Sequence, residues 1–461
     1  MIIRRIAGSY RDPSGHVFDG GTHVLRSVRP PAAAEFDQVK QTGLLDRLVA
    51  EGVLLPFEVV DRRLLAEQEP DAVSVLRHPR LDFISHPYEW SFRGLRAAAL
   101  LQLDIQLRAL EAGVALGDAS AYNLQFIGSK PVFIDHLSFR PYREGEFWTG
   151  HQQFCNQFLN PLLLTALTGV PFQTWYRGSL DGIPSREVSP LFPRRKLLSR
   201  RMLLHVYLLG KLQGESTRSS AVQLANAGLP RRRFQKTLED LRGWVAGLEP
   251  KGSRFSEWSD YAANTSYGQA EGSAKRAFVA DFVAATKPRM LWDLGCNTGD
   301  FSVVALGAGA ETVVGFEFDH GALDAAFLRA TQEGLSLLPL YLDAANPSPD
   351  QGWAQRERAG LGARRSADAV LALALVHHLA ISRNVPLAEV VAWIVSLAPK
   401  GVIEFVPKAD AMVQRLLALR ADIFEDYDEA YFLAALESGG RIVKTARVTE
   451  SGRLLAWFAR D

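Results

Sequence analysis

The second half of the chain alternates short apolar runs with helical patterns, and this alternation constrains the fold more than any other feature. Successive apolar runs predict strands at Met290 to Leu294, Thr312 to Phe318, Leu337 to Leu342, Ala369 to Val376 and Val402 to Val406. Helical patterns fill most of the gaps, and two last runs, 441–448 and 454–458, predict an antiparallel hairpin. Alternating strands and helices indicate an α/β fold with a mainly parallel sheet. Ligands of such sheets bind beyond the carboxyl ends of the strands.

The sequence pattern changes near residue 250. Before this point, long helical patterns such as Phe92 to Ala112 and Arg201 to Leu212 mix with proline-rich loops. The segment Glu249 to Ser253 is rich in turn-forming residues. We therefore expect a mixed α+β domain at 1–248 and an α/β domain at 254–461.

Composition excludes several classes of protein. The net charge is +1, so we expect no nucleic-acid partner recruited through global charge. The two cysteines, Cys155 and Cys296, argue against a disulfide framework or a cysteine-based zinc site and fit a reducing compartment. The longest apolar run, Ala369 to Val376, is too short to span a bilayer, and the N-terminus does not read as a secretory signal. We expect a cytoplasmic protein without a membrane partner; its oligomeric state stays open.

The sharpest motif follows the first predicted strand of the second half and opens a helix. It reads Leu-Trp-Asp293-Leu-Gly295-Cys-Asn297-Thr-Gly299. A dinucleotide site would need the pattern G-x-G-x-x-G, which seats a pyrophosphate on a helix N-terminus. An acid just before the turn would repel a phosphate, whereas it would suit a cationic ligand.

The pattern Asp293-x-Gly295-x-x-x-Gly299 resembles motif I of class I S-adenosylmethionine (SAM)-dependent methyltransferases. The resemblance covers about 255–461 and implies a seven-stranded Rossmann-like sheet with SAM as cofactor. It implies cofactor contacts from Asp293, Gly295, Asn297, Gly299, Glu317 and Asp343, with Glu317 on the ribose hydroxyls and Asp343 near the adenine amino group. Asp319 competes for the role of Glu317, and another nucleotide-binding sheet, or a member that has lost SAM binding, remains an alternative. This half also resembles methyltransferase-like nodulation proteins of root-symbiont bacteria.

His377 and His378 follow the fourth predicted strand, where that family places its substrate-facing motif. Histidine titrates near neutral pH, so either could act as a general base. Adjacent residues at a strand end point to opposite sides, so we expect one to face the pocket and favour His378 over His377. The alternative is that both only pack. Glu404 is a secondary candidate for pocket polarity.

A second group of polar residues lies in the first half. Asp118 and Asn123 have the spacing D-x-x-x-x-N, and Asp135 ends an apolar strand. This resembles the catalytic loop and metal-binding aspartate of kinase-like phosphotransferases, including the aminoglycoside type. The resemblance implies ATP and Mg²⁺, with Asp118 acting on an acceptor hydroxyl and Asn123 and Asp135 holding the metal. No glycine-rich phosphate loop or strand lysine is identified, and a capped turn followed by a strand is the alternative.

Together these patterns predict a SAM-dependent methyltransferase, preceded by a kinase-like or substrate-recruiting domain. The expected acceptor is a small molecule, methylated on oxygen, carbon or nitrogen. A bifunctional kinase-methyltransferase and a non-catalytic binding module are the rivals, and an RNA methyltransferase is disfavoured.

Overall fold

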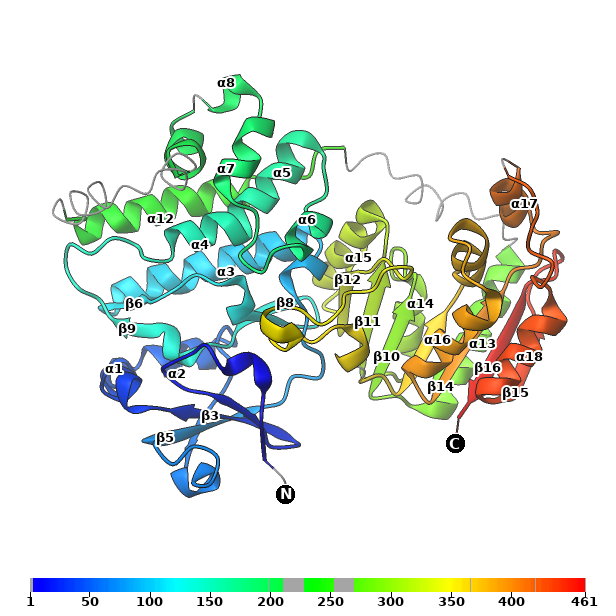
Figure 1. The fold of residues 1–461 in the computed structure, drawn as a ribbon, viewed down its shortest axis with the longest axis horizontal. Helices are drawn as coiled ribbons and strands as arrows, with labels where there is room; N and C mark the ends of the chain where they lie inside the picture. Colours follow the sequence, from blue (N-terminus) through cyan, green and yellow to red (C-terminus); the bar gives the residue numbers. More distant parts are fainter. Residues whose placement is uncertain are drawn as a thin grey trace. The chain divides into compact units, whose positions relative to one another are not determined.

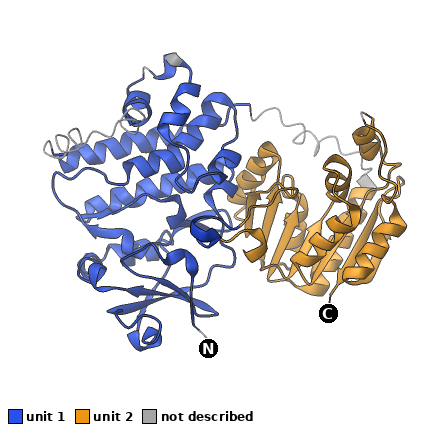
Figure 2. Cartoon of the chain, in the orientation of Figure 1, with its two compact units in different colours: residues 1–252, 350–358 blue, residues 253–349, 359–461 orange. Residues whose placement is uncertain are grey.

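The computed structural model describes residues 3–197, 199–209, 228–252, 269–364, 366–418 and 420–460. The chain divides into two compact units (Figure 2). Unit 1 contains Met1–Gly252 together with Asp350–Arg358, and unit 2 contains Ser253–Pro349 and Ala359–Asp461. The division near Gly252 lies in the turn-rich segment singled out above. Nothing in the sequence pattern had pointed to the placement of Asp350–Arg358 in unit 1.

Unit 2 is built on one seven-stranded sheet (Figure 1). Its strands in spatial order are β12 (Leu337–Tyr341), β11 (Thr312–Glu317), β10 (Met290–Leu294), β13 (Ala369–Ala372), β14 (Lys400–Phe405), β16 (Leu454–Ala459) and β15 (Arg441–Arg447). The first five are parallel, and β16 runs antiparallel to both of its neighbours. The chain order reverses between β10 and β13. Ligands of open α/β sheets bind at such a switch point, beyond the carboxyl ends of the strands.

Helices cover this sheet because its central strands are buried and mostly apolar. The helices of unit 2 are α13 (Gln269–Thr286), α14 (Asp300–Gly307), α15 (His320–Gln332), α16 (Leu387–Leu397), α17 (Ala411–Leu417) and α18 (Glu429–Gly439). Every residue of β10 and β13 is buried. One core cluster joins Phe282 of α13 to Leu291, Val313, Leu371 and Val402 of four adjacent strands. This core fixes the carboxyl ends of β10, β11 and β13 beside one another.

The prediction of a strand from Ala369 to Val376 was wrong in its second half. Strand β13 ends at Ala372, and Ala374 has a positive φ of 50°. The backbone N–H of Ala374 donates to the carboxylate of Glu404, at 2.8 Å. A side chain thus takes the place of a ladder partner, which ends the strand. A π-helical turn, His378–Ser382, follows.

Unit 1 begins with a five-stranded sheet of antiparallel pairs. Its spatial order is β1 (Arg4–Arg5), β2 (Val17–Asp19), β3 (His23–Val28), β5 (Ser74–Pro79) and β4 (Glu58–Val60). Helices α1 (Pro30–Gln41) and α2 (Leu44–Ala50) lie between β3 and β4 in the chain. The sheet provides the frame that holds β3, whose Arg26 reaches the polar group described below.

The second part of unit 1 is mostly helical. The predicted long helix is α3 (Phe92–Glu111), and it is followed by two short antiparallel pairs, β6 (Val114–Leu116) with β9 (Phe139–Pro141) and β7 (Leu124–Ile127) with β8 (Lys130–Phe133). Further helices are α4 (His151–Phe154), α5 (Asn160–Thr168), α6 (Gln173–Arg177), α7 (Ser185–Val188), α8 (Arg194–Leu197), α9 (Arg200–Met202) and α12 (Arg231–Ala246). Two π-helical segments, Cys155–Leu159 and Leu203–Tyr207, directly follow α4 and α9. Residues 210–212 of the predicted helix Arg201 to Leu212 lie outside the described residues.

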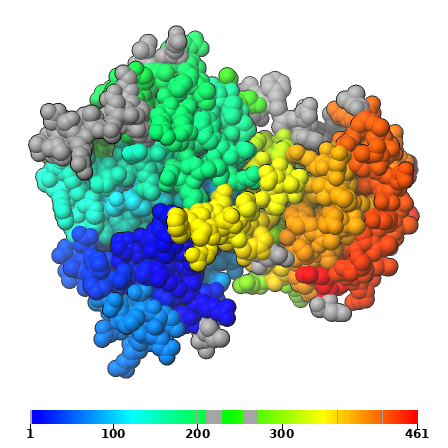
Figure 3. Space-filling model, in the orientation of Figure 1, coloured from blue at the N-terminus to red at the C-terminus, as the bar shows by residue number. Residues whose placement is uncertain are grey.

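The segment Asp350–Arg358 lies on the surface of unit 1 and is held there by specific contacts (Figure 3, yellow against dark blue). The Glu357 carboxylate accepts a hydrogen bond of 2.7 Å from the Tyr10 hydroxyl and pairs with Arg11. The Arg358 guanidinium lies 4.1 Å from the centre of the Tyr122 ring. This segment therefore packs beside Tyr122, whose backbone lies next to Asn123.

None of the described helices is both long and apolar enough to cross a membrane.

Candidate functional site

The glycine motif forms a tight left-handed turn at the carboxyl end of β10. Gly295 has φ +74° and Gly299 has φ +86°, values that L-residues with side chains rarely adopt. The backbone N–H groups of Gly295 and Cys296 both donate to the carbonyl of Phe316 in β11, at 2.8 and 3.0 Å. A Cβ built on Gly295 would meet no atom closer than 3.9 Å. The turn is therefore pinned to the sheet on one side, and a Cβ at Gly295 would make only an ordinary contact, with Leu375.

Asp293 lies beneath this turn and not on its surface. The side chain is 2% exposed, and its carboxylate accepts a hydrogen bond of 2.7 Å from the Ser302 hydroxyl. Burial raises the pKa of Asp293 to about 6. Asp293, the acid predicted to suit a cation, is thus buried beneath the turn, and a nearby cation would favour its ionised form.

Glu317, the last residue of β11, points its carboxylate at the same turn. The carboxylate accepts backbone hydrogen bonds from Asn297, Phe318 and Asp319, at 2.7, 2.8 and 2.7 Å. Burial is the main cause that raises the pKa of Glu317. A carboxylate has about four acceptor positions, so three backbone donors leave capacity for another.

Asp319 has a different role. Its carboxylate accepts from the backbone N–H of Ala322, at 2.8 Å, and caps the N-terminus of α15. Asn297, with φ +50°, is the residue of the turn that donates to Glu317. The two competing acids are therefore separated by what they bind: Glu317 faces the turn, and Asp319 caps a helix.

Asp343 lies in the loop that follows β12. It accepts a hydrogen bond of 3.1 Å from the backbone of Ala345, and the Arg383 guanidinium lies 3.8 Å from its carboxylate. Arg383 also lies 5.6 Å from the centre of the Phe318 ring. Phe318 is 49% exposed, directly after Glu317. An exposed aromatic ring thus lies beside the arginine that approaches Asp343.

His377 and His378 do not diverge as predicted. The strand ends before them and they begin a helical turn, so their rings lie side by side with centres 4.1 Å apart. His377 is 1% exposed, and neither of its ring nitrogens has a hydrogen-bond partner among the described residues. Burial lowers the pKa of both, that of His378 to about 4, so both rings are neutral at pH 7. Each can accept a proton, and His377 has unused hydrogen-bonding capacity.

A cluster of buried charges close to these histidines was largely missed from sequence. Lys275 of α13 and Glu404 of β14 form an ion pair of 2.5 Å, with exposed side-chain fractions of 3% and 0%. Arg453, also buried, pairs with Asp410 at 2.7 Å and lies 3.7 Å from Glu404. Glu404 is therefore engaged in the interior and does not line an open pocket. A lysine within an apolar helix was the signal that could have revealed the pair.

The polar residues predicted in unit 1 do come together. The Asn123 amide donates to Asp118 at 3.0 Å, and the Ser138 hydroxyl donates to the same carboxylate at 2.6 Å. Asp135 forms an ion pair of 2.8 Å with Arg26 of β3 and accepts from the backbone of Leu137. Burial, followed by the charge of Asp135, raises the pKa of Asp118. Sequence reasoning missed Arg26, a basic residue on a strand that places its charge where a metal ion was expected.

The residues around Gly295 fit SAM better than a dinucleotide. A Cβ at Gly295 would meet no atom closer than 3.9 Å, Asp293 places a carboxylate behind the turn, and Glu317 keeps an acceptor position at its edge. A pyrophosphate would meet the carboxylates of buried Asp293 and half-buried Glu317 here, which is unfavourable.

Comparison with known proteins places the chain in a family. Nodulation protein NoeA of Rhizobium meliloti (strain 1021) is 50% identical over 460 residues, which cover 99% of this chain and 96% of that protein. A 23S rRNA (uracil(747)-C(5))-methyltransferase, RlmC of Vibrio vulnificus (strain YJ016), is 33% identical over 115 residues, or 25% of this chain and 27% of that protein. No family model matches the chain.

Solved structures of methyltransferases are similar to part of the chain. Magnesium protoporphyrin IX methyltransferase (ChlM) from Synechocystis PCC 6803 has a TM-score of 0.33 and 17% identity, covering 46% of this chain and 95% of that one. The N-methyltransferase NodS from Bradyrhizobium japonicum WM9 has a TM-score of 0.30 and 10% identity, covering 42% and 97%. The near full-length identity to NoeA settles the relationship: the chain belongs to the NoeA family of nodulation proteins.

Proposed function

We propose that unit 2 binds SAM at the Gly295 turn and transfers its methyl group to a small-molecule acceptor. The observation that carries this proposal is the left-handed turn at the sheet's switch point, with Asp293 buried behind it and Glu317 at its edge. The methyltransferase names among the partial relatives are consistent with the proposal.

Each residue of the turn has a defined part in this proposal. Gly295 lets the backbone approach the cofactor, because it has no Cβ and adopts the left-handed conformation that the turn requires. Glu317 accepts hydrogen bonds from ribose hydroxyls with its remaining lone pairs. Asp343 contributes polarity near the adenine, and Asn297 and Gly299 hold the shape of the turn. Bound here, SAM supplies an electrophilic methyl group on a sulfonium cation.

His377 and His378 would act on the acceptor. Methyl transfer is a displacement that depends mainly on holding the reacting atoms in line. An acceptor hydroxyl or acidic carbon also has to lose a proton, which a neutral imidazole can take. The sequence favoured His378, and His377, whose ring nitrogens have no hydrogen-bond partner among the described residues, is the second candidate.

The proposal is tested with the purified full-length chain. Native mass spectrometry is expected to detect co-purified SAM or its demethylated product. SAM carrying a labelled methyl group is then offered with small-molecule extracts, sugars among them, or with RNA. We expect label in small molecules, reduced in His378→Gln or His377→Gln at unchanged SAM affinity. Label in RNA, together with steeply salt-dependent RNA binding, would show that the acceptor is RNA and not a small molecule. If calorimetry detects no heat when SAM is added, the remaining interpretation is a non-catalytic binding module.

A second candidate function, phosphoryl transfer in unit 1, rests on the proximity of Asp118, Asn123 and Asp135. If unit 1 is kinase-like, these residues would bind ATP and Mg²⁺. Arg26 and Ser138 weigh against this, because they already engage both carboxylates. Magnesium-dependent ATP binding that is lost in Asp135→Ala would support a bifunctional enzyme.

A further inference from the structure

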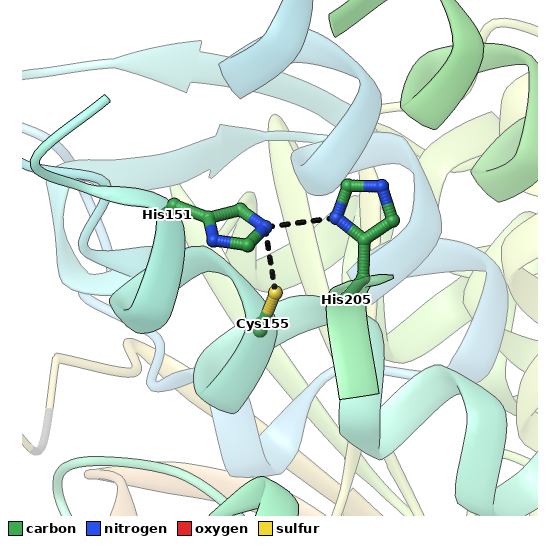
Figure 4. A group of neighbouring side chains, drawn as sticks. All are labelled: His151, Cys155 and His205. Atoms are coloured by element: carbon green, nitrogen blue, oxygen red, sulfur yellow. Dashed lines mark hydrogen bonds between the residues drawn. The ribbon is translucent and has the colours of Figure 1, made fainter. Parts of the chain in front are cut away.

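Three side chains capable of binding a transition metal meet in the helical part of unit 1, and none of them belongs to the sites described above. His151 begins α4, Cys155 begins the π-helical segment that follows, and His205 lies in the second π-helical segment (Figure 4). The Nε2 atom of His151 lies 2.8 Å from Nδ1 of His205 and 3.6 Å from Sγ of Cys155. All three potential ligand atoms lie within 4.8 Å of one another.

The local structure explains how these residues come to face one point. His151 and Cys155 are four residues apart, so they lie on the same face of one helical turn. His205 comes from a segment 50 residues later and meets them from another helix, as Figure 4 shows. Cys155 and His205 both lie in π-helical segments, which are rare and concentrate at functional sites. Because two such segments contribute to one cluster, they indicate a functional site more strongly than either segment does alone.

The surroundings of the cluster are aromatic, and His151 is half-buried. The centre of the Trp148 ring lies 5.7 Å from that of His151, and the centre of the Trp244 ring lies 6.2 Å from that of His205. Cys155 and His205 are 0% and 3% exposed. Burial keeps both imidazoles neutral by lowering the pKa of His151 to about 4 and that of His205 to about 3. Neutral imidazole is the form of histidine that binds metals.

We propose that His151, Cys155 and His205 bind one Zn²⁺ ion through Nε2, Sγ and Nδ1. Zinc takes nitrogen and sulfur ligands at about 2.0–2.1 and 2.3 Å in tetrahedral geometry, which places two nitrogens about 3.3 Å apart and a nitrogen and a sulfur about 3.6 Å apart. The His151–Cys155 separation already has this value, and the two imidazoles need to part by about 0.5 Å. Three protein ligands leave the fourth position for water.

Binding would change the protonation of the cluster. The Cys155 thiol is protonated without a metal, because burial raises the pKa of that thiol. Zinc would take the thiolate as a ligand and the thiol proton would pass to solvent. The one proton between the two imidazoles would move to the outward nitrogen of the ring that carries it, which frees both inward nitrogens for the metal. The ion would then join α4 to the segment Leu203–Tyr207, which a disulfide cannot do, because that segment contains no cysteine. The scarcity of cysteines had argued against a zinc site, but it does not exclude one in which histidines supply most ligands.

The test uses untagged full-length protein. Elemental analysis after chelator treatment and reloading with Zn²⁺ should give one ion per chain, and the melting temperature should rise on loading. Loading with Co²⁺ should produce thiolate-to-cobalt charge-transfer absorption and the intense visible bands of a tetrahedral site. Cys155→Ser and His205→Gln should lose the tight ion and the rise in melting temperature. His23→Gln, which removes a histidine of β3 outside the cluster, should keep both.

The outcomes that overturn the proposal are equally definite. Folded wild-type protein that retains no Zn²⁺, or Co²⁺ spectra without a thiolate band, would show that the three side chains only pack against one another. Equal zinc content in wild type, Cys155→Ser and His205→Gln would place the metal elsewhere. The cobalt spectrum of the wild type keeps the test decisive even if a variant fails to fold.

Discussion

The acidic residues of the two units are held in opposite ways. In unit 2, Glu317 is held by three backbone N–H groups and keeps an acceptor position beside an open glycine turn. In unit 1, Asp135 already has a cation, Arg26, and Asp118 is engaged by Asn123 and Ser138. A carboxylate fixed by backbone amides stays available to a ligand, whereas one paired with a guanidinium has much less to gain from another cation. The difference shows that a carboxylate at the end of a strand can either keep a free acceptor position or be fully used in stabilising the fold.

The largest effect should come from Gly295→Arg. A side chain at φ +74° would be strained and would fill the space in front of the turn. We expect SAM affinity to fall by at least about 100-fold, to below detection in calorimetry, the size of a loss of roughly 3 kcal/mol. Gly334→Arg is the matched control, because Gly334 also has a positive φ, +64°, and its Cβ would meet nothing within 4 Å. Unchanged SAM binding in Gly295→Arg would refute the assignment of the site.

Glu317→Gln should have the next largest effect. The amide keeps the size of the side chain but loses the charge that strengthens its hydrogen bonds, which are worth about 1.5–3 kcal/mol when one partner is ionised. We expect SAM affinity to fall roughly tenfold or more in calorimetry. Asp319→Asn should leave it unchanged, because asparagine caps helices about as well as aspartate. If Asp319→Asn lowered SAM affinity and Glu317→Gln did not, Asp319 would be the residue that binds the ribose hydroxyls.

The pH dependence of SAM binding should sharpen the comparison further. Burial raises the pKa of Asp293 from 3.8 to about 6, and a cationic ligand favours the ionised form. SAM affinity should therefore rise by up to about tenfold between pH 5 and 7. Without ligand, the free energy of unfolding should fall as the pH rises from 3.8 to about 6. The reason is that the folded state binds the Asp293 proton more tightly than the unfolded chain does.

Titration calorimetry of Asp293→Asn provides the control for this profile. Asparagine can still accept the Ser302 hydrogen bond, so the turn should keep its shape while its pH response flattens. An unaltered profile in this variant would assign the titration to another group, with Glu317 the first to examine.

The smallest effect on SAM binding is expected from Asp135→Ala in unit 1. It removes the ion pair with Arg26, although Arg26 keeps a second partner, Asp12, at 2.6 Å. We expect the free energy of unfolding of unit 1 to fall by about 1–3 kcal/mol, measured by denaturant titration, with SAM affinity unchanged. The comparison between the units would break if the wild type bound ATP with Mg²⁺ and this variant did not.

Much of unit 2 could be predicted from sequence, because its central strands are buried on both faces and most of them end in a recognisable turn. The Gly295 motif and Glu317 lie where the pattern placed them. The end of β13 could not be predicted, because Glu404, 30 residues later in the chain, takes the backbone donor of Ala374. The orientation of His377 and His378 was wrong for that same reason.

Long-range pairing also explains what was missed elsewhere. Arg26 meets Asp135, and Lys275 meets Glu404, across more than 100 residues of chain, and no local spacing signals such pairs. His151 and Cys155 do have a local signal, a spacing of four, but His205 completes the group only through the fold. The inclusion of Asp350–Arg358 in unit 1 likewise depends on distant partners such as Tyr10 and Tyr122.

A crystal structure of the full-length protein grown with SAM tests the central claim most directly. The account predicts density for the cofactor against the Gly295 turn, with the ribose hydroxyls on Glu317 and the sulfonium on the side of the His377–His378 pair. Side chains filling the space in front of Gly295, or a dinucleotide bound there in preference to SAM, would contradict it.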